Sequence, residues 1–239
     1  MKKYLNPFNP NFLFFLAIIV LGAYYTYPVD LTPAQKSAYI NSYLTTIYLT
    51  SGGIAIGIIL GFFLAFLKSL DFKPLSFVID EYVDIIRGTP VLLQLMIFAF
   101  VILTAFSDNF YAAVIALGLN SSAYVAEIVR GGINSVDKGQ MEAARAMGLT
   151  YPIAMREIIF PQAIKNILPA LVNEFITLFK ETSVVGLIGI FDLTMQSKSL
   201  QAVLFSPEPI LFAGVVYYAN VKFFSFLAKL LEKRLNKND

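Results

Sequence analysis

One predicted helix carries three polar side chains that together could hold a small polar molecule. Asn120, Tyr124 and Glu127 follow one another at spacings of four and three residues, so they lie on roughly one side of an α-helix. An amide, a phenol and a carboxylate can hydrogen-bond an ammonium group or a polar side chain. Arg130 comes three residues after Glu127, however, and the two could instead form a local ion pair or a gate. The sequence leaves both roles open for Glu127.

Further polar residues interrupt apolar segments. Lys180 and Glu181 are neighbours in one such segment and point about 100° apart on a helix, so they do not neutralise each other on one face. An ionisable residue inside a membrane helix costs about 2.5 to 3.5 kcal/mol on insertion, so such residues usually face a polar cavity or a partner. We therefore add Glu181, Ser183 and Gln94 to the candidate substrate-binding residues. For a lone glutamine, a hydrogen bond between helices is the competing role.

The residue types that are missing exclude several chemistries. The chain has no cysteine and no histidine, which removes disulfides, thiolate nucleophiles and the usual ligands of zinc and haem. We predict no catalytic residue and no metal site. The glycine-rich stretches GGIAIG and GLIGI lack the lysine of a phosphate-binding loop, so the chain should bind no ATP itself. A net charge of only +2 gives no case for nucleic acid.

The composition predicts an all-α integral membrane protein. Of 239 residues, 57% are hydrophobic and 14% charged, against about 25% charged in soluble domains. A membrane-spanning helix needs about 20 mostly apolar residues. Because the first apolar segment lacks a cleavage site of the A-x-A kind, we interpret it as a retained span rather than a cleaved signal. Six transmembrane helices are predicted, at 11–27, 40–67, 90–106, 110–130, 166–190 and 209–229.

Basic residues predict the orientation of these spans, since they concentrate in cytoplasmic loops. With both termini in the cytoplasm, fourteen of the 18 Lys and Arg residues lie inside and only Lys36 and Lys198 outside, while Lys180 and Lys222 lie in or near spans.

Two neighbouring segments carry packing signals. Gly53, Gly57 and Gly61 recur every four residues in the second span, where small side chains let another helix approach closely. That helix could belong to the same bundle or to a second subunit. The segment after this span has apolar residues at helical spacing between Leu75 and Ile86, with acidic residues on the other side, and predicts an amphipathic helix at the membrane surface.

The loop between the fourth and fifth spans, residues 131–165, is long and rich in helix formers. A short helix is predicted over Gln140–Met147, and Gly148 stands where a left-handed cap would end it. Thr150 then begins a second helix, which is expected to stop near Pro161. An ordered, charged helical loop of this kind could fit a groove on another protein.

This loop resembles a known motif. Glu142, Ala143, Ala144, Gly148, Ile158 and Pro161 match the spacing of the EAA loop of ABC importer permeases, although Phe160 stands where the family usually has Leu. The stretches RGTPVLLQL, AYVAEIVRGGINSVDKGQMEAARAMG and KETSVVGLIGI resemble the histidine and glutamine permease branch. The resemblance covers about residues 38 to 230. It implies a permease domain at 38–239, of the type I importer kind with five core spans, preceded by an extra helix and outside loop at 1–37.

The resemblance also implies partners and a role. In the family, the EAA loop is a coupling helix that docks on a separate ATPase subunit, which is where ATP is used. The resemblance assigns that contact to Glu142, Ala143, Ala144, Arg145, Met147 and Gly148. A second permease subunit, identical or related, and an extracytoplasmic binding protein would complete an importer for a polar amino acid. The resemblance implies that the importer lies in the lipid bilayer of a bacterial cytoplasmic membrane.

Two other functions compete with this interpretation. A secondary transporter of small polar solutes could use Glu127, Lys180 and Glu181 for ion coupling, but the sequence shows no repeated halves. A pore or structural membrane protein would have no need of the loop.

Overall fold

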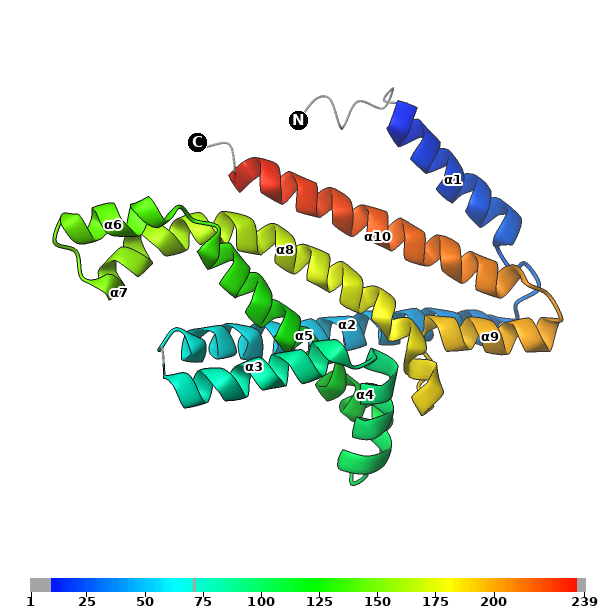
Figure 1. The fold of residues 1–239 in the computed structure, drawn as a ribbon. Coiled ribbons are helices and arrows are strands. Elements are labelled where there is room, and N and C mark those ends of the chain that lie inside the picture. The colour runs from blue at the N-terminus through cyan, green and yellow to red at the C-terminus, as the bar shows by residue number, and fades with distance from the viewer. Residues whose placement is uncertain (1–9, 71, 236–239) are drawn as a thin grey trace.

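The computed structural model describes residues 10–70 and 72–235, and within them the protein is a bundle of helices (Figure 1). The helices of the first half are α1 (Pro10–Thr26), α2 (Pro33–Lys68), α3 (Lys73–Gly88), α4 (Val91–Ile97) with the π-helical η1 (Phe98–Ile102), and α5 (Asn109–Asn134). The second half contains α6 (Lys138–Ala146), α7 (Tyr151–Ala154), the π-helical η2 (Met155–Ile159), α8 (Phe160–Glu181), the 3-10 helix η3 (Thr182–Ile188), α9 (Leu193–Leu204) and α10 (Glu208–Leu235).

Helices α2 and α5 form the most extensive contact of the bundle, and glycines on α2 make it possible. A Cβ atom built on Gly57 would lie 2.7 Å from the Cβ of Ser121, and one built on Gly61 would lie 2.5 Å from that of Val125. Both distances are shorter than real Cβ contacts, so only glycine lets the two backbones come this close. Of the two interpretations of the glycine row, packing within the bundle is confirmed.

The amphipathic helix predicted after the second span is present as α3. Its apolar face packs on α5, with Ile79 and Val83 buried. The chain then turns by 106° into α4 and η1, so that α3 and the apolar segment 91–102 are two arms of a sharp bend. Thr89 and Pro90 lie at the bend in extended conformations, which end one helix and begin the next.

The second half of the chain wraps around this core. Helix α8 packs on α5 and α10, and α1 packs antiparallel on α10 (Figure 1). Helix α9 was not predicted. It is capped by Asp192, a buried residue whose carboxylate accepts hydrogen bonds from the backbone N–H groups of Thr194 and Met195. Lys198, which we placed in an outside loop, therefore lies within a helix.

The predicted all-helical membrane fold is confirmed for the described residues, and each predicted span contains a helix. By length and composition, three of the helices can cross a membrane alone, namely α2, α5 and α10, and the bent pair of α3 with α4 and η1 would count as a fourth. The apolar part of α1 is shorter than a span, and α8 carries several charged residues. Six spans therefore stays a prediction.

Candidate functional site

The predicted loop forms two short helices that project from one end of the bundle (Figure 1). The first, α6, begins at Asp137, whose carboxylate accepts a hydrogen bond of 2.7 Å from the backbone N–H of Gly139. It ends at Ala146, and Gly148, two residues further on, has a φ of +87°. The predicted left-handed cap is confirmed.

Three hydrogen bonds fasten this cap. The N–H of Leu149 donates to the carbonyl of Ala144 over 3.2 Å, and the N–H of Gly148 donates to the carbonyl of Arg145 over 3.0 Å. These two bonds are the Schellman arrangement, which satisfies carbonyls left open at a helix end. The Arg145 guanidinium also donates to the Leu149 carbonyl over 2.9 Å. The turn between α6 and α7 is therefore held by two backbone hydrogen bonds and one from the Arg145 side chain.

The residues of α6 that the resemblance singles out are mostly on the outside. Glu142, Ala143, Arg145 and Gly148 are exposed, and 72% of Met147 is accessible. Only Ala144 is fully buried, where a small side chain lets α6 pack on the rest of the loop. A charged and apolar surface on a rigid projection is suited to contact with another protein.

The second loop helix differs from the prediction at its far end. Thr150 does precede α7 in an extended conformation, but its side chain makes no capping hydrogen bond. The helix also does not stop near Pro161. It widens into the π-helical η2 and continues as α8, with Pro161 in the first turn. Proline lacks the N–H of a regular helix and is tolerated at a helix start, so the wide turn lets the helix continue past it.

Gln94 and Asn120 form a buried polar cluster between the α3–α4 bend and α5. The Gln94 side-chain amide donates to the Ile86 carbonyl over 2.7 Å and to the Thr89 hydroxyl over 2.8 Å. The Asn120 amide in turn donates to Oε1 of Gln94 over 3.0 Å. The expected hydrogen bond between helices is therefore present. Asn120 Oδ1 is buried and has no hydrogen-bond partner among the described residues.

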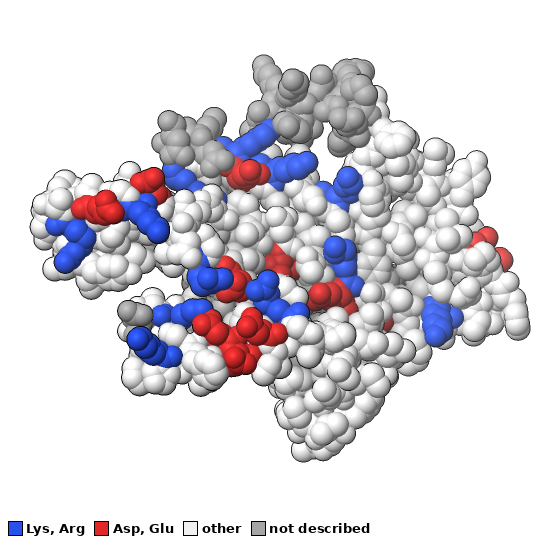
Figure 2. All heavy atoms as spheres, viewed as in Figure 1, with Lys and Arg blue, Asp and Glu red and all other residues white. Residues whose placement is uncertain are grey.

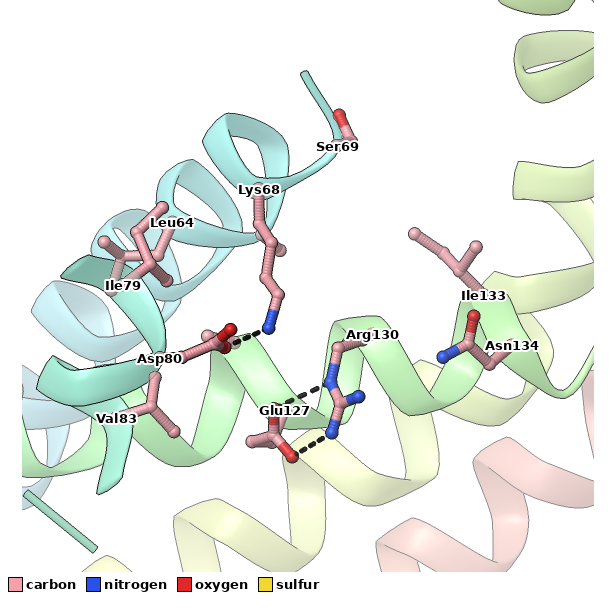
Figure 3. A pocket seen from close by; sticks show the side chains of 12 residues that line it. Leu64, Lys68, Ser69, Ile79, Asp80, Val83, Glu127, Arg130, Ile133 and Asn134 are labelled. Carbon is pink, nitrogen blue, oxygen red and sulfur yellow. Dashed lines mark hydrogen bonds and ion pairs between the residues drawn. The ribbon is translucent and has the colours of Figure 1, made fainter. Parts of the chain in front are cut away.

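Glu127 takes part in the expected ion pair with Arg130. The Nε and Nη2 atoms of Arg130 donate to its two carboxylate oxygens over 2.8 and 2.6 Å (Figure 3). Arg87, at the end of α3, adds a second cation 3.3 Å from the same carboxylate, and its guanidinium lies 5.3 Å from the centre of the Tyr124 ring. Glu127 thus joins the end of α3 to α5, and Tyr124 lies beside the same arginine.

The remaining predicted residues lie elsewhere. Ser183 lines a different cavity from Glu127, together with Lys180, between η3, α9 and α10. Glu181 is half-buried, and within the described part of the chain it forms no ion pair with Lys180. The structure therefore brings together Gln94 with Asn120 and Tyr124 with Glu127, but it does not bring Ser183 to them.

Other charged or buried residues near these clusters were not predicted as site residues. Glu174 on α8 is 7% exposed and accepts a 2.8 Å hydrogen bond from the hydroxyl of Ser121 on α5. The sequence does single out Glu174 as an ionisable residue inside an apolar segment, like Glu127, Lys180 and Glu181, but does not assign it to the substrate site. Arg87 and the ion pair between Lys68 and Asp80 complete the charged cluster around Glu127. Because they come from other helices, no spacing in the sequence pairs them with it.

A bundle of apolar helices with a rigid, charged helical loop at one end defines a membrane protein built to contact a partner outside the membrane. Comparison with known proteins gives its family. The family described as binding-protein-dependent transport system inner membrane component matches residues 53–237. The chain belongs to this family, as the sequence motif predicted, and is a transport component of an ABC importer whose ATPase resides in separate subunits.

Relatives and solved structures agree with this assignment. The arginine transport system permease protein ArtQ of Bacillus subtilis is 46% identical over 188 residues, which is 77% of this chain and 86% of that protein. The putative glutamine transport system permease protein GlnP of Rickettsia typhi is 36% identical over the whole of both chains. A crystal structure of an amino acid ABC transporter with histidines aligns with a TM-score of 0.78 at 45% identity, covering 83% of this chain and 94% of that one. The MetNI methionine transporter, at 18% identity and a TM-score of 0.76 over 86% of this chain and 100% of that chain, shares the fold.

Proposed function

We propose that this chain forms the membrane pathway of an ATP-driven importer for a polar amino acid. The relatives named for arginine and glutamine transport support the substrate class. The observation that carries the proposal is the rigid projection of α6, whose exposed surface is available to a partner. Partner ATPase subunits use ATP, and a second permease subunit and an extracytoplasmic binding protein complete the importer.

The projection acts as the coupling helix. The exposed residues Glu142, Ala143, Arg145 and Met147 contact the ATPase subunit, while Ala144 and Gly148 fix the shape of the contact. Because the α7–η2–α8 helix runs from the loop into the bundle without a break, movement of α6 is carried directly to α8. Helix α8 packs on both α5 and α10, so the pathway can respond to closure of the ATPases.

The polar residues of α5 face the substrate. Asn120 Oδ1 is a buried hydrogen-bond acceptor without a donor among the described residues. An ammonium or amide group of an amino acid can supply that donor. One and two turns later, Tyr124 and Glu127 continue the same side of α5 towards the charged cluster. Gln94 holds Asn120 in place. Ser183 lines a separate cavity, so any contact of Ser183 or Glu181 with the substrate is at a different point of the pathway. A cationic substrate competes with the two arginines for Glu127.

The charges support an orientation with both termini in the cytoplasm. Charged side chains gather at the end of the molecule where α6 projects and where α2 and α3 meet, and few appear around α9 at the opposite end (Figure 2). The ends of α2, α5 and α10 and the start of α8 lie towards the charged end (Figure 1). Basic residues prefer the cytoplasmic side, so that end faces the cytoplasm.

The absence of native cysteine makes a direct test of the coupling contact possible. Met147→Cys places one thiol on the exposed tip of α6, and Tyr25→Cys, at a residue 73% exposed near the end of α1, places one away from the loop. A short bifunctional thiol reagent should join Met147→Cys to a co-purified ATPase subunit carrying an introduced surface cysteine. It should leave Tyr25→Cys unjoined. Equal cross-linking of both variants, or of neither, would contradict the docking role of α6.

A further inference from the structure

A cavity at the junction of η3, α9 and α10 offers cationic and hydroxyl groups. It has a volume of about 460 Å³, and cavities that bind small molecules measure roughly 300 to 1,000 Å³. Its polar groups belong to Lys180, Ser183, Thr194, Ser197 and the tyrosines of α10, and no acidic residue of the described chain lines it. The cavity therefore has room for a small molecule and presents hydrogen-bond donors without negative charge.

Two lysines at this cavity have no carboxylate partner. Lys180 lines the cavity, and the ammonium group of Lys222 lies 5.5 Å from the centre of the Tyr218 ring, which is part of the lining. Neither lysine belongs to an ion pair among the described residues. Glu181, the neighbour of Lys180 in sequence, is not part of the lining. Unlike the arginines at Glu127, these two cations are available to an anion from outside the chain.

The cavity also presents an unused hydroxyl group. Ser183 follows Lys180 by three residues, across the junction of α8 and η3, and both side chains line the cavity. Within the described chain the Ser183 side chain makes no hydrogen bond, whereas the Thr194 hydroxyl already donates to that of Tyr217 over 3.2 Å. The Ser183 hydroxyl can donate to one oxygen of a carboxylate while the Lys180 ammonium binds the other.

The depth of the cavity decides which anion fits. Helix α10 can cross a membrane alone, and Lys222 is halfway along it, about 21 Å from either end at 1.5 Å per residue. The hydrocarbon core of a bilayer is about 30 Å thick, so the middle of such a helix lies well below the lipid headgroups. A lipid phosphate does not reach this depth. A small anion that moves through the transporter passes it.

We propose that this cavity binds the α-carboxylate of the transported amino acid during its passage. Lys180 and Ser183 bind the carboxylate, and Lys222 stabilises it electrostatically from the rim of the cavity. The inference rests on the proposed function and adds to it a second point of the pathway, separate from Asn120 and Glu127. Because every amino acid has this carboxylate, the site distinguishes amino acids from other polar solutes rather than one amino acid from another.

Equilibrium binding to the purified complex of permease and ATPase subunits, without the extracytoplasmic binding protein, tests this site. The probes are arginine and glutamine, each compared with its α-amide, which lacks the carboxylate. The parent complex should bind the acid about tenfold more tightly than the amide, because hydrogen bonds between ionised partners are the strong ones. Lys180→Met should remove this preference and leave the affinity for the amide unchanged. Lys198→Met, at an exposed lysine of α9 outside the cavity, should change neither affinity.

A second pair of variants fills the cavity without altering charge. Gly214 lines the cavity and has open space at its Cβ position, so Gly214→Leu should fold and should weaken binding of both the acid and the amide. Ala202→Leu, at an exposed position of α9 outside the cavity, should weaken neither. Unchanged binding in Gly214→Leu would place the amino acid elsewhere and overturn the proposal.

Three further outcomes would also overturn it. The first is a preference for the acid that Lys180→Met leaves intact, or a loss of acid and amide binding by the same factor. The second is displacement of the amino acid by acetate at equal concentration, because the site would then accept any carboxylate. The third is loss of the second permease subunit from the Lys180→Met complex, because the lysine would then pair with a neighbouring subunit. A parent complex that imports with ATP but shows no acid preference refutes this site alone, whereas one that binds selectively without importing refutes the proposed function.

Discussion

Replacing Gly148 by alanine should weaken the coupling of ATP hydrolysis to transport while leaving the membrane bundle intact. Gly148 has a φ of +87°, and no described atom outside its own chain neighbours lies within 4 Å of the position a Cβ would take. The added methyl group therefore meets no steric clash with neighbours and acts through backbone strain alone. That strain is about 1 to 2 kcal/mol for a residue with a side chain in the left-handed region. It shifts the ratio of capped to uncapped loop by a factor of roughly 5 to 30.

The assay is the number of ATP molecules hydrolysed per amino acid imported by the reconstituted complex, together with hydrogen exchange at the loop. Gly148→Ala should raise the ATP ratio several-fold and speed exchange at the N–H groups of Gly148 and Leu149, which close the cap. Gly131→Ala is the matched control, because Gly131 is exposed, has open space at its Cβ and lies in α5 without a positive φ. An unchanged ATP ratio with unchanged exchange in Gly148→Ala would refute the role assigned to the cap.

Three further substitutions test the interior. Gly57→Ala should lower the melting temperature of the purified protein, since overpacking of a tight contact costs about 1 to 3 kcal/mol, whereas Gly214→Ala, with open space at its Cβ, should not lower it. Gln94→Leu leaves the Ile86 carbonyl and the Asn120 amide without their hydrogen-bond partner at the α3–α4 bend, which costs about 1 to 3 kcal/mol of stability. A melting temperature equal to that of the parent protein would contradict the role of Gln94 in joining α5 to this bend. Glu127→Gln should change stability by less than about 1 kcal/mol, because its ion pairs are partly exposed. It should reduce uptake of cationic amino acids more than neutral ones in competition assays, and equal effects on both would favour a purely structural pair with Arg130.

Local features of the fold could be predicted from the sequence because their causes are local. The positive φ at Gly148 follows from a glycine placed just after a run of helix formers, and the amphipathic α3 follows from apolar residues at helical spacing. The close contact at Gly57 also followed from spacing, because small residues on one helix face admit another backbone. The identity of that neighbour, α5, became visible only in the structure.

Features that depend on distant residues could not be predicted. Gln94 and Asn120 are 26 residues apart in sequence, and their hydrogen bond depends on the 106° bend between α3 and α4. The second cation at Glu127 comes from Arg87 on another helix, so only the nearby Arg130 could be expected. The prediction that the second loop helix stops near Pro161 was wrong for a different reason. Proline usually ends a helix, and a π-turn that accommodates it has no reliable sequence signal.

Uptake into liposomes is the most direct measurement of whether this chain is the pathway of an ATP-driven amino acid importer. The chain is reconstituted with its co-purified partners, with ATP enclosed or omitted, and all ion gradients are collapsed. Uptake of a polar amino acid only when ATP is present is the predicted result, and competition among amino acids then identifies the substrate. Uptake without ATP that follows an imposed proton or sodium gradient would contradict it, and would make Glu127, Lys180 and Glu181 candidates for ion coupling instead.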